Sequence, residues 1–197
     1  FHEMGKSDDV SQKTGIQYVP NIKKLIMEAE TDFDSAAFDS AEDKLRTALV
    51  FSPDNIHALS LLGKLFYIQE KFKEAEFIFR RISELTPDDS AAYNNLGAVL
   101  AKQKRLREAI SATRKSLELE PDSPVTELNL AGMHAVNGDT SEAILYFKRA
   151  YEKLGEKILP LSENPNFDSL RNKKEFYEIL LKVRKNSKNG GKKDVSK

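Results

Sequence analysis

Residues 56–89 read IHALSLLGKLFYIQEKFKEAEFIFRRISELTPDD, and residues 90–123 read SAAYNNLGAVLAKQKRLREAISATRKSLELEPDS. The two stretches carry Leu, Gly, Ala and Pro at matching positions, and the match extends to the sequence on either side. The alanines that recur every 34 residues are Ala41, Ala75, Ala109 and Ala143. The matching prolines are Pro53, Pro87 and Pro121. A fixed period of this size is typical of a solenoid, an array of similar structural units.

Each unit has the pattern of two helices. In residues 56–89, Leu59, Leu62 and Phe66 recur at helical spacing, and a second apolar series follows from Phe72. Only a short charged turn separates the two series, so the helices are expected to be antiparallel. In the first three units the second helix is expected to stop before a proline, which cannot continue a helix.

The whole chain is predicted to be an all-α solenoid of about four helix pairs with a C-terminal capping helix. We expect a flexible lead over residues 1–20 and the repeat array over 21–155. The expected repeats are about 22–55, 56–89, 90–123 and 124–155. A linker and an amphipathic capping helix are predicted over 156–185, because an array must cover its last apolar face. Residues 186–197 are rich in lysine and are predicted to be a disordered basic tail.

The composition limits the kinds of site this chain can have. It has no cysteine, which excludes disulfides and cysteine-bound metals. No stretch approaches the roughly 20 apolar residues of a membrane-spanning helix. The net charge is zero, but acidic residues predominate over 1–55 and basic ones over 156–197. The chain begins at Phe1 rather than Met, so we leave its compartment open between cytoplasm and periplasm.

The repeated positions resemble the tetratricopeptide repeat family, in its bacterial form. The second unit carries the family's packing residues Leu59, Leu62, Gly63, Phe66, Ala75, Phe79 and Pro87. The resemblance extends over roughly 22–155. It is weaker in the first unit, which has Asp32 at an aromatic position, and the fourth unit has Gly155 in place of the proline. Terminal repeats are often atypical, because one of their faces meets solvent.

The sequence predicts no catalytic, metal or cofactor site. The histidines His2, His57 and His134 do not have metal-ligand spacing, and no Gly-x-Ser-x-Gly or phosphate-binding loop is present. Acidic pairs such as Asp88-Asp89 fall at helix starts, where they favour the helix dipole. We therefore predict that the chain is not an enzyme.

The resemblance implies that the first helix of each pair lines a concave, peptide-binding face. The residues it places there are His57, Ser60, Lys64, Tyr67, Asn94, Asn95, Ala98, Lys102 and Asn129. Asn95 and Asn129 share one position in successive repeats, and an amide can both donate to and accept from a peptide backbone. Lys64 and Lys102 would attract an acidic residue or a terminal carboxylate.

The sequence thus favours an interaction scaffold or adaptor that binds a peptide or helix of a partner protein in the groove. One alternative is a self-assembling structural module, in which the acidic and basic ends of successive copies meet. Another is a non-catalytic fragment of a larger enzyme or assembly complex. We expect a protein partner or a homo-oligomer, and no nucleic acid, because the basic tail lacks interleaved aromatic residues.

Overall fold

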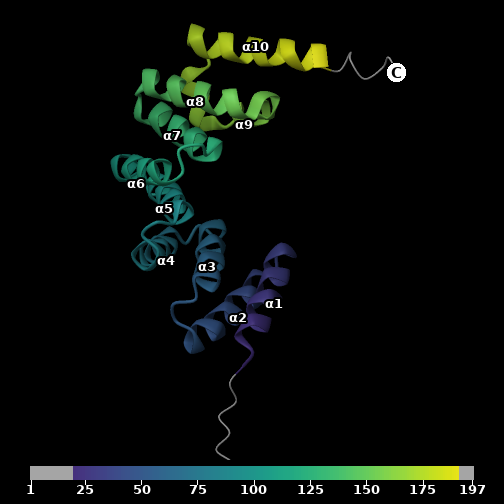
Figure 1. The fold of residues 1–197 in the computed structure, drawn as a ribbon, viewed down its shortest axis with the longest axis vertical. Helices are drawn as coiled ribbons and strands as arrows, with labels where there is room; N and C mark the ends of the chain where they lie inside the picture. The colour runs from purple at the N-terminus through teal and green to yellow at the C-terminus, as the bar shows by residue number, and fades with distance from the viewer. Residues whose placement is uncertain (1–19, 191–197) are drawn as a thin grey trace, which may run out of the picture. The chain divides into compact units, whose positions relative to one another are not determined.

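The computed structural model describes residues 20–190, and the side chains of residues 20–185. The regular secondary structure of this part of the chain is entirely helical, with no strand, which confirms the predicted all-α class (Figure 1). His2, most of the lead and the end of the basic tail lie outside the described residues.

Eight of the described helices form four consecutive pairs. The pairs are α1 (Ile22–Asp34) with α2 (Phe38–Phe51), α3 (Ile56–Ile68) with α4 (Phe72–Leu85), α5 (Ser90–Lys102) with α6 (Leu106–Leu119), and α7 (Pro124–Asn137) with α8 (Thr140–Leu154). The C-terminal segment then contains η2 (Gly155–Lys157), α9 (Ile158–Ser162), η3 (Pro165–Leu170) and α10 (Lys174–Gly190).

The first helix of each pair begins with the same local device. A side-chain oxygen of the residue before the helix accepts a hydrogen bond from a backbone N–H of the first turn, which would otherwise have no partner. The four capping residues are Asn21, Asn55, Asp89 and Ser123. They recur with the repeat period, so the helix starts are encoded locally.

The turn inside each pair has the same backbone conformation in all four pairs, although the residue type at its central position differs. The residues with positive φ are Ala36 (59°), Glu70 (59°), Lys104 (63°) and Gly138 (87°). They stand one repeat period apart, yet only the last is glycine, the residue that adopts this conformation without steric cost. The turn geometry therefore recurs whichever residue type occupies the position.

The helices fall into two compact units that divide between Pro53 and Asp54. The first unit contains the α1–α2 pair, whose buried residues are Ile26, Ala29, Ala41, Leu45 and Ala48. Asp32 of α1 joins Lys44 and Ser40 of α2 through its carboxylate. Burial of one apolar face between the two helices explains why small alanines recur in this pair.

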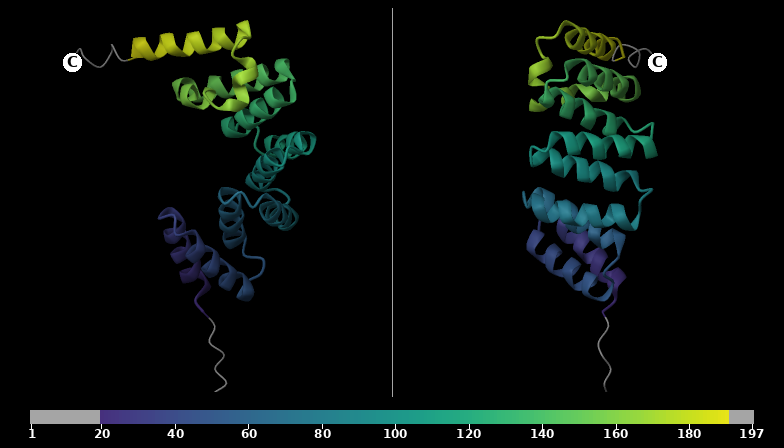
Figure 2. Two further views of the ribbon diagram at one scale, coloured as in Figure 1. Left: turned by 180° about the vertical axis from the view of Figure 1, so that it is seen from behind. Right: turned by 90° about the vertical axis from the view of Figure 1, so that its left-hand side faces the viewer.

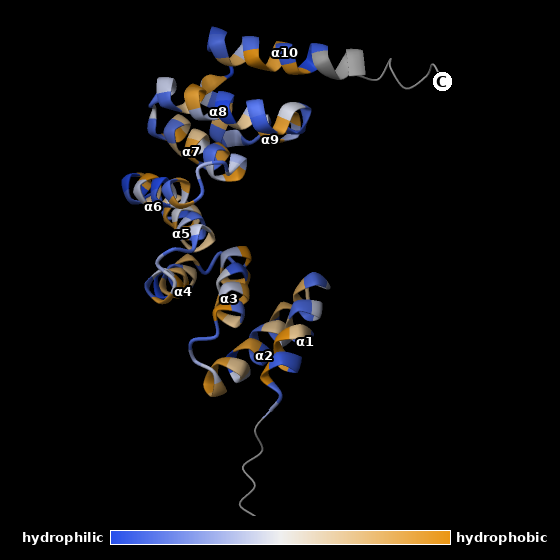
Figure 3. Cartoon of the chain, viewed as in Figure 1, coloured by the Kyte–Doolittle hydropathy of each residue, from blue (hydrophilic) through white to orange (hydrophobic). Residues whose placement is uncertain are grey.

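In the second unit, helices α3 to α8 stack in sequence order, with α4 against α5 and α6 against α7 (Figure 2). Glycines allow the helices of a pair to approach closely. A Cβ atom at Gly63 would lie 2.8 Å from Cζ of Phe79, and one at Gly97 would lie 2.0 Å from Oγ1 of Thr113. The second helices α4, α6 and α8 carry mixed polar and apolar residues, as expected for helices with one buried face (Figure 3).

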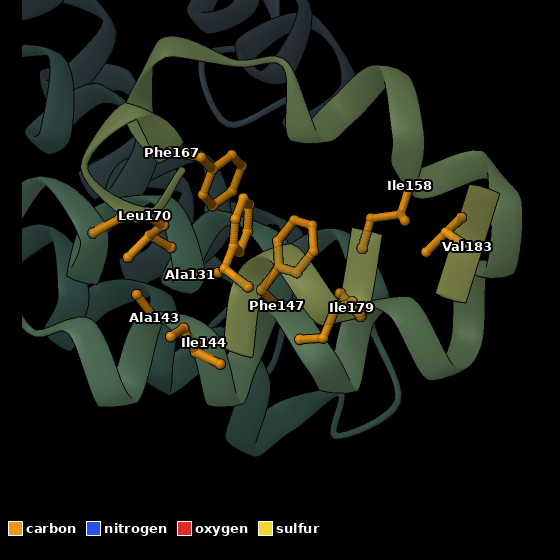
Figure 4. Close-up of a cluster of buried hydrophobic side chains, with 12 residues drawn as sticks. Ala131, Ala143, Ile144, Phe147, Ile158, Phe167, Leu170, Ile179 and Val183 are labelled. Carbon is orange, nitrogen blue, oxygen red and sulfur yellow. The ribbon is translucent and has the colours of Figure 1, made fainter. Parts of the chain in front are cut away.

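The C-terminal segment covers the last repeat, as the capping prediction required. Phe147 of α8 packs against Phe167 of η3 and Phe176 of α10, with ring centroids 5.2 and 4.6 Å apart (Figure 4). Ile158 and Val183 extend the same buried cluster. Helix α10 continues to Gly190, past residue 185 where we had placed its end, because Lys, Asn and Ser do not stop a helix as glycine does.

Candidate functional site

A groove in the second unit is a concave feature of the described residues that could take a ligand. Its volume is about 480 Å³, within the range of ligand-binding clefts. Its lining, which we call the α5–α7 groove, consists of Tyr67, Ala98, Ala101, Lys102, Leu106, Leu128, Asn129, Gly132, Met133, Val136, Asn164, Pro165 and Asn166. Most of these side chains come from the first helices α5 and α7.

Helical spacing places the α7 residues on one face. Leu128 and Asn129 stand four and three residues before Gly132, and Val136 stands four after it, so these positions lie on one face of the helix. On α5 the groove is bordered by the small Ala98 and Ala101, followed by Lys102 in the last turn. Small residues here leave room between the helices.

The third wall comes from outside the repeats. Asn164 stabilises this segment, because its Oδ1 accepts a hydrogen bond from the backbone N–H of Asn166 at 2.9 Å. The next residue, Phe167, is buried in the capping core, and the Ser169 hydroxyl donates to the Ala135 carbonyl of α7 at 3.1 Å. These contacts hold residues 164–166 beside Gly132, where a Cβ atom added to the glycine would lie 3.4 Å from Nδ2 of Asn166.

The amide of Asn129 is oriented by a neighbour on α5. Its Nδ2 donates a hydrogen bond to Oδ1 of Asn94 at 2.9 Å. The bond crosses from one repeat to the next, and it uses one of the two N–H groups of Asn129. The carbonyl oxygen and the second N–H of this amide therefore remain available at the groove.

Lys102 is the one charged side chain among the groove-lining residues. It is exposed, and it makes no ion pair or hydrogen bond within the part of the chain that the structure describes. Tyr67, which α3 contributes to the lining, is half-buried, and its ring meets that of Phe72 edge-on at 5.8 Å. Burial raises the pKa of the Tyr67 phenol, so it remains a neutral hydrogen-bond donor.

The predicted concave residues divide into two sets. Tyr67, Ala98, Lys102 and Asn129 line the α5–α7 groove. The residues outside its lining are His57, Ser60, Lys64, Asn94 and Asn95. His57 and Lys64 are exposed on α3. Asn94 does not line the groove, but it accepts a hydrogen bond from the lining residue Asn129.

Sequence reasoning missed the wall at residues 164–166. The segment has no repeat period, so nothing in the 34-residue pattern pointed to it. The signals available were Asn164-Pro165, a turn-favouring pair, and the apolar Phe167 and Leu170 just beyond, which needed a core to enter. They indicate a turn docked on the array, but not which helices it meets.

His134 has a structural role. It is buried, its Nδ1 lies 3.0 Å from Oδ2 of Asp139, and its ring stacks on Tyr146. Hydrogen bonds from Asn137 and His134 lower the pKa of Asp139. Nowhere in residues 20–185 do three or more His, Asp or Glu side chains gather as a metal site would require. Among the helices of that same stretch, none is long and apolar enough to span a bilayer.

The fold defines the class: an α-helical repeat protein built from consecutive helix pairs. Residues 32–100 and residues 90–123 each match the tetratricopeptide repeat family. The chain therefore contains tetratricopeptide repeats over residues 32–123, which confirms the resemblance read from its packing positions. Repeats of this family are protein-interaction modules, so the chain is a protein-interaction scaffold in this general sense.

Solved structures with the same fold include several of the protein MamA. One is 24% identical and has a TM-score of 0.64, covering 70% of this chain and 80% of that one. MamA from Desulfovibrio magneticus RS-1 is 19% identical with a TM-score of 0.64, covering 73% and 78%. A mutant O-GlcNAc transferase from Thermobaculum terrenum is 24% identical with a TM-score of 0.64, covering 70% of this chain but 27% of its own.

At these identities the likeness concerns the fold alone. No curated protein sequence matches the chain significantly. The transferase shows that the same repeat fold occurs as one part of a larger enzyme, whereas MamA is matched over most of its length. The site of this chain must therefore be argued from its own residues.

Proposed function

We propose that this chain binds a peptide segment of a partner protein in the α5–α7 groove, and acts as an adaptor without chemistry of its own. The observation that carries the proposal is the composition of the groove. It combines apolar side chains with three asparagine amides and a single charge, in a volume of about 480 Å³. Ligand clefts typically have this mixture of apolar surface and few polar groups.

A peptide is the ligand whose chemistry suits this lining. An extended peptide has alternating N–H and C=O groups, and each amide side chain can satisfy both. Val136 is 53% exposed and lies in the groove, so a partner's apolar side chain would remove its surface from water. The N–H groups and carbonyls of the groove's own helices are used within those helices, which leaves recognition to the side chains.

A matched pair of substitutions on α5 tests the proposal. Ala98 lines the groove. Ala91 lies on the same helix and is exposed, but it does not line the groove. Ala98→Leu should narrow the groove and weaken capture of partner proteins from a lysate of the source organism, while Ala91→Leu should not. Both variants should retain the helical circular dichroism of the wild type.

The comparison has a clear negative outcome. If wild type, Ala98→Leu and Ala91→Leu capture the same proteins in the same amounts, the groove is not the binding site. Self-association of the chain stays a prediction. Light scattering at low and high salt tests it, because contacts between oppositely charged ends weaken as salt screens them.

A further inference from the structure

We infer that the α5–α7 groove selects a partner segment in which a carboxylate, from Asp or Glu, stands next to an apolar side chain. Lys102 pairs with the carboxylate, and the Met133–Val136 side of α7 contacts the apolar group. This inference rests on the proposed function and specifies the chemistry of the partner.

Charge gives the first step. Lys102 lines the groove, and no acidic residue does. No described residue neutralises it. A partner carboxylate would therefore gain an ion pair, without displacing an existing one. A partner lysine or arginine would meet an uncompensated like charge, which acts against binding.

The enclosure of the groove strengthens this preference. Ion pairs on open surfaces contribute little, because water screens both charges. In a groove bordered by Leu106, Leu128 and Pro165, a bound peptide would exclude part of that water and lower the local dielectric constant. Lys64, the other lysine predicted on the concave face, lies outside the groove lining, so a peptide bound in the groove would not exclude water from it in this way.

Apolar surface gives the second step. Val136 is 53% exposed, and Met133 beside it is almost fully buried. Methionine adapts its shape to a partner, so Met133 can serve as a floor under an incoming side chain. A partner residue that covered Val136 would bury apolar surface on both molecules. The partner thus needs an apolar side chain close to its carboxylate.

Amides set how the segment lies between these two contacts. Asn129 is held by Asn94, and Asn164 is held by its own turn through the backbone of Asn166. Each retains part of its hydrogen-bonding capacity toward the groove. Pro165 has no backbone N–H. The polar contacts of this wall therefore come from the side-chain amides of its neighbours, Asn164 and Asn166.

The test uses the full chain and two libraries of fluorescent nine-residue peptides. Both libraries have Leu, Val or Ile beside the central residue and random residues elsewhere. The central residue is Glu in one library and Gln in the other, so the two differ only in charge. We expect the wild type to bind the Glu library about fivefold more tightly at low salt, and the difference to shrink as salt is added.

Variants assign the effect to one side chain. Lys102→Gln should abolish the preference for the Glu library, while Lys104→Gln should keep it. Lys104 is an exposed lysine in the following turn and does not line the groove, which makes it a matched control. Lys102→Glu should reverse the choice and favour a third library with a central Lys. The Ala98→Leu variant should weaken binding of all the libraries.

The outcomes separate this inference from the proposed function. Equal binding of the Glu and Gln libraries, with both weakened by Ala98→Leu, would overturn the carboxylate preference and leave the groove as the peptide site. A preference that survived in Lys102→Gln would also overturn it. If no library bound, the inference would be wrong, and the lysate capture with Ala98→Leu would then decide the proposed function on its own.

Discussion

Nδ2 of Asn129 lies 2.9 Å from Oδ1 of Asn94 and donates a hydrogen bond to it. The two residues belong to the first helices of adjacent repeats, so this bond links the two helices that line most of the groove. Asn95, the neighbour we had aligned with Asn129, lies outside the groove lining. The side-chain hydrogen bond of Asn129 to the preceding repeat is therefore made with Asn94, one residue before Asn95.

The Asn94–Asn129 bond should be measurable by a double-mutant cycle. Each single change to Ala is expected to lower the free energy of unfolding by about 1 kcal/mol, and the coupling energy should be about 0.5–1.5 kcal/mol. Urea denaturation of the two single variants and the double variant gives these values. Asn95→Ala with Asn129→Ala serves as the control pair. A coupling energy near zero for Asn94 and Asn129 would contradict the bond.

Two glycines on first helices should respond in opposite ways to the same substitution. At Gly97 an added Cβ would lie 2.0 Å from Oγ1 of Thr113, so Gly97→Ala is expected to destabilise the protein by about 1–3 kcal/mol. At Gly132 the closest atom would be 3.4 Å away, which is ordinary contact. Gly132→Ala should therefore stabilise the helix by up to about 1 kcal/mol. Thermal unfolding compares the two.

A rescue variant separates crowding from other causes at Gly97. Adding Thr113→Ala to Gly97→Ala removes the hydroxyl that would clash and should restore part of the lost stability. If the double variant were as unstable as the sum of the two single changes, steric conflict with Thr113 would not be the reason.

The turns with positive φ predict another pair of opposite effects. Glu70 has φ of 59°, which costs energy for any residue with a Cβ, so Glu70→Gly should raise stability by about 0.5–1 kcal/mol. Gly138 has φ of 87° with open space around it, and Gly138→Ala should lower stability by a similar amount. Chemical denaturation tests both. A loss of stability in Glu70→Gly would show that its side chain outweighs the backbone strain.

Glu76 should make the second unit sensitive to acid. Burial favours a higher pKa for this carboxyl, but hydrogen bonds from Gln103, Arg80 and Arg105 outweigh it, and the pKa is lowered from its usual 4.5. The Arg105 contact is 2.7 Å long and joins α4 to the turn of the next repeat. Folding therefore favours the charged form. The stabilisation is complete above the unfolded pKa and is lost as the pH falls through the lower folded value.

Glu76→Gln removes this titration. The variant should be less stable than the wild type at neutral pH, and the difference should narrow as the pH falls below about 4.5. Urea midpoints measured over a pH series show both effects. Glu84→Gln, an exposed change on the same helix, should stay within about 0.5 kcal/mol of the wild type. A constant difference between Glu76→Gln and wild type at all pH values would refute the assignment.

Adjacent residues on α10 test how this helix is attached. Phe176 is fully buried against Phe147, whereas Tyr177 is 52% exposed. Phe176→Ala should cost about 3–5 kcal/mol, because it leaves a cavity in the capping core, and Tyr177→Ala should cost little. Hydrogen exchange reports the result by region. If amides of α10 and η3 exchanged equally slowly in both variants, the helix would not depend on Phe176.

The repeat pattern determined much of this protein without reference to tertiary structure. The spacing of apolar residues such as Leu59 and Leu62 and of prolines such as Pro87 predicted the helix pairs. The N-cap residues found in the structure, such as Asn55 and Ser123, act within a single helix turn. The need to cover the last apolar face predicted a capping helix, and Phe176 of α10 is buried against that face. These features depend on local or nearest-neighbour contacts, which a periodic sequence displays directly.

Only the tertiary structure decided which residues make the groove. The family resemblance placed Tyr67, Lys102 and Asn129 on the concave face, but it could not separate them from Lys64 and Asn95. That distinction depends on how far one helix stands from the next, and on where a non-repeat segment folds back. Asn166 reaches the groove because Phe167 is buried in the capping core, a contact between distant parts of the chain that no period encodes.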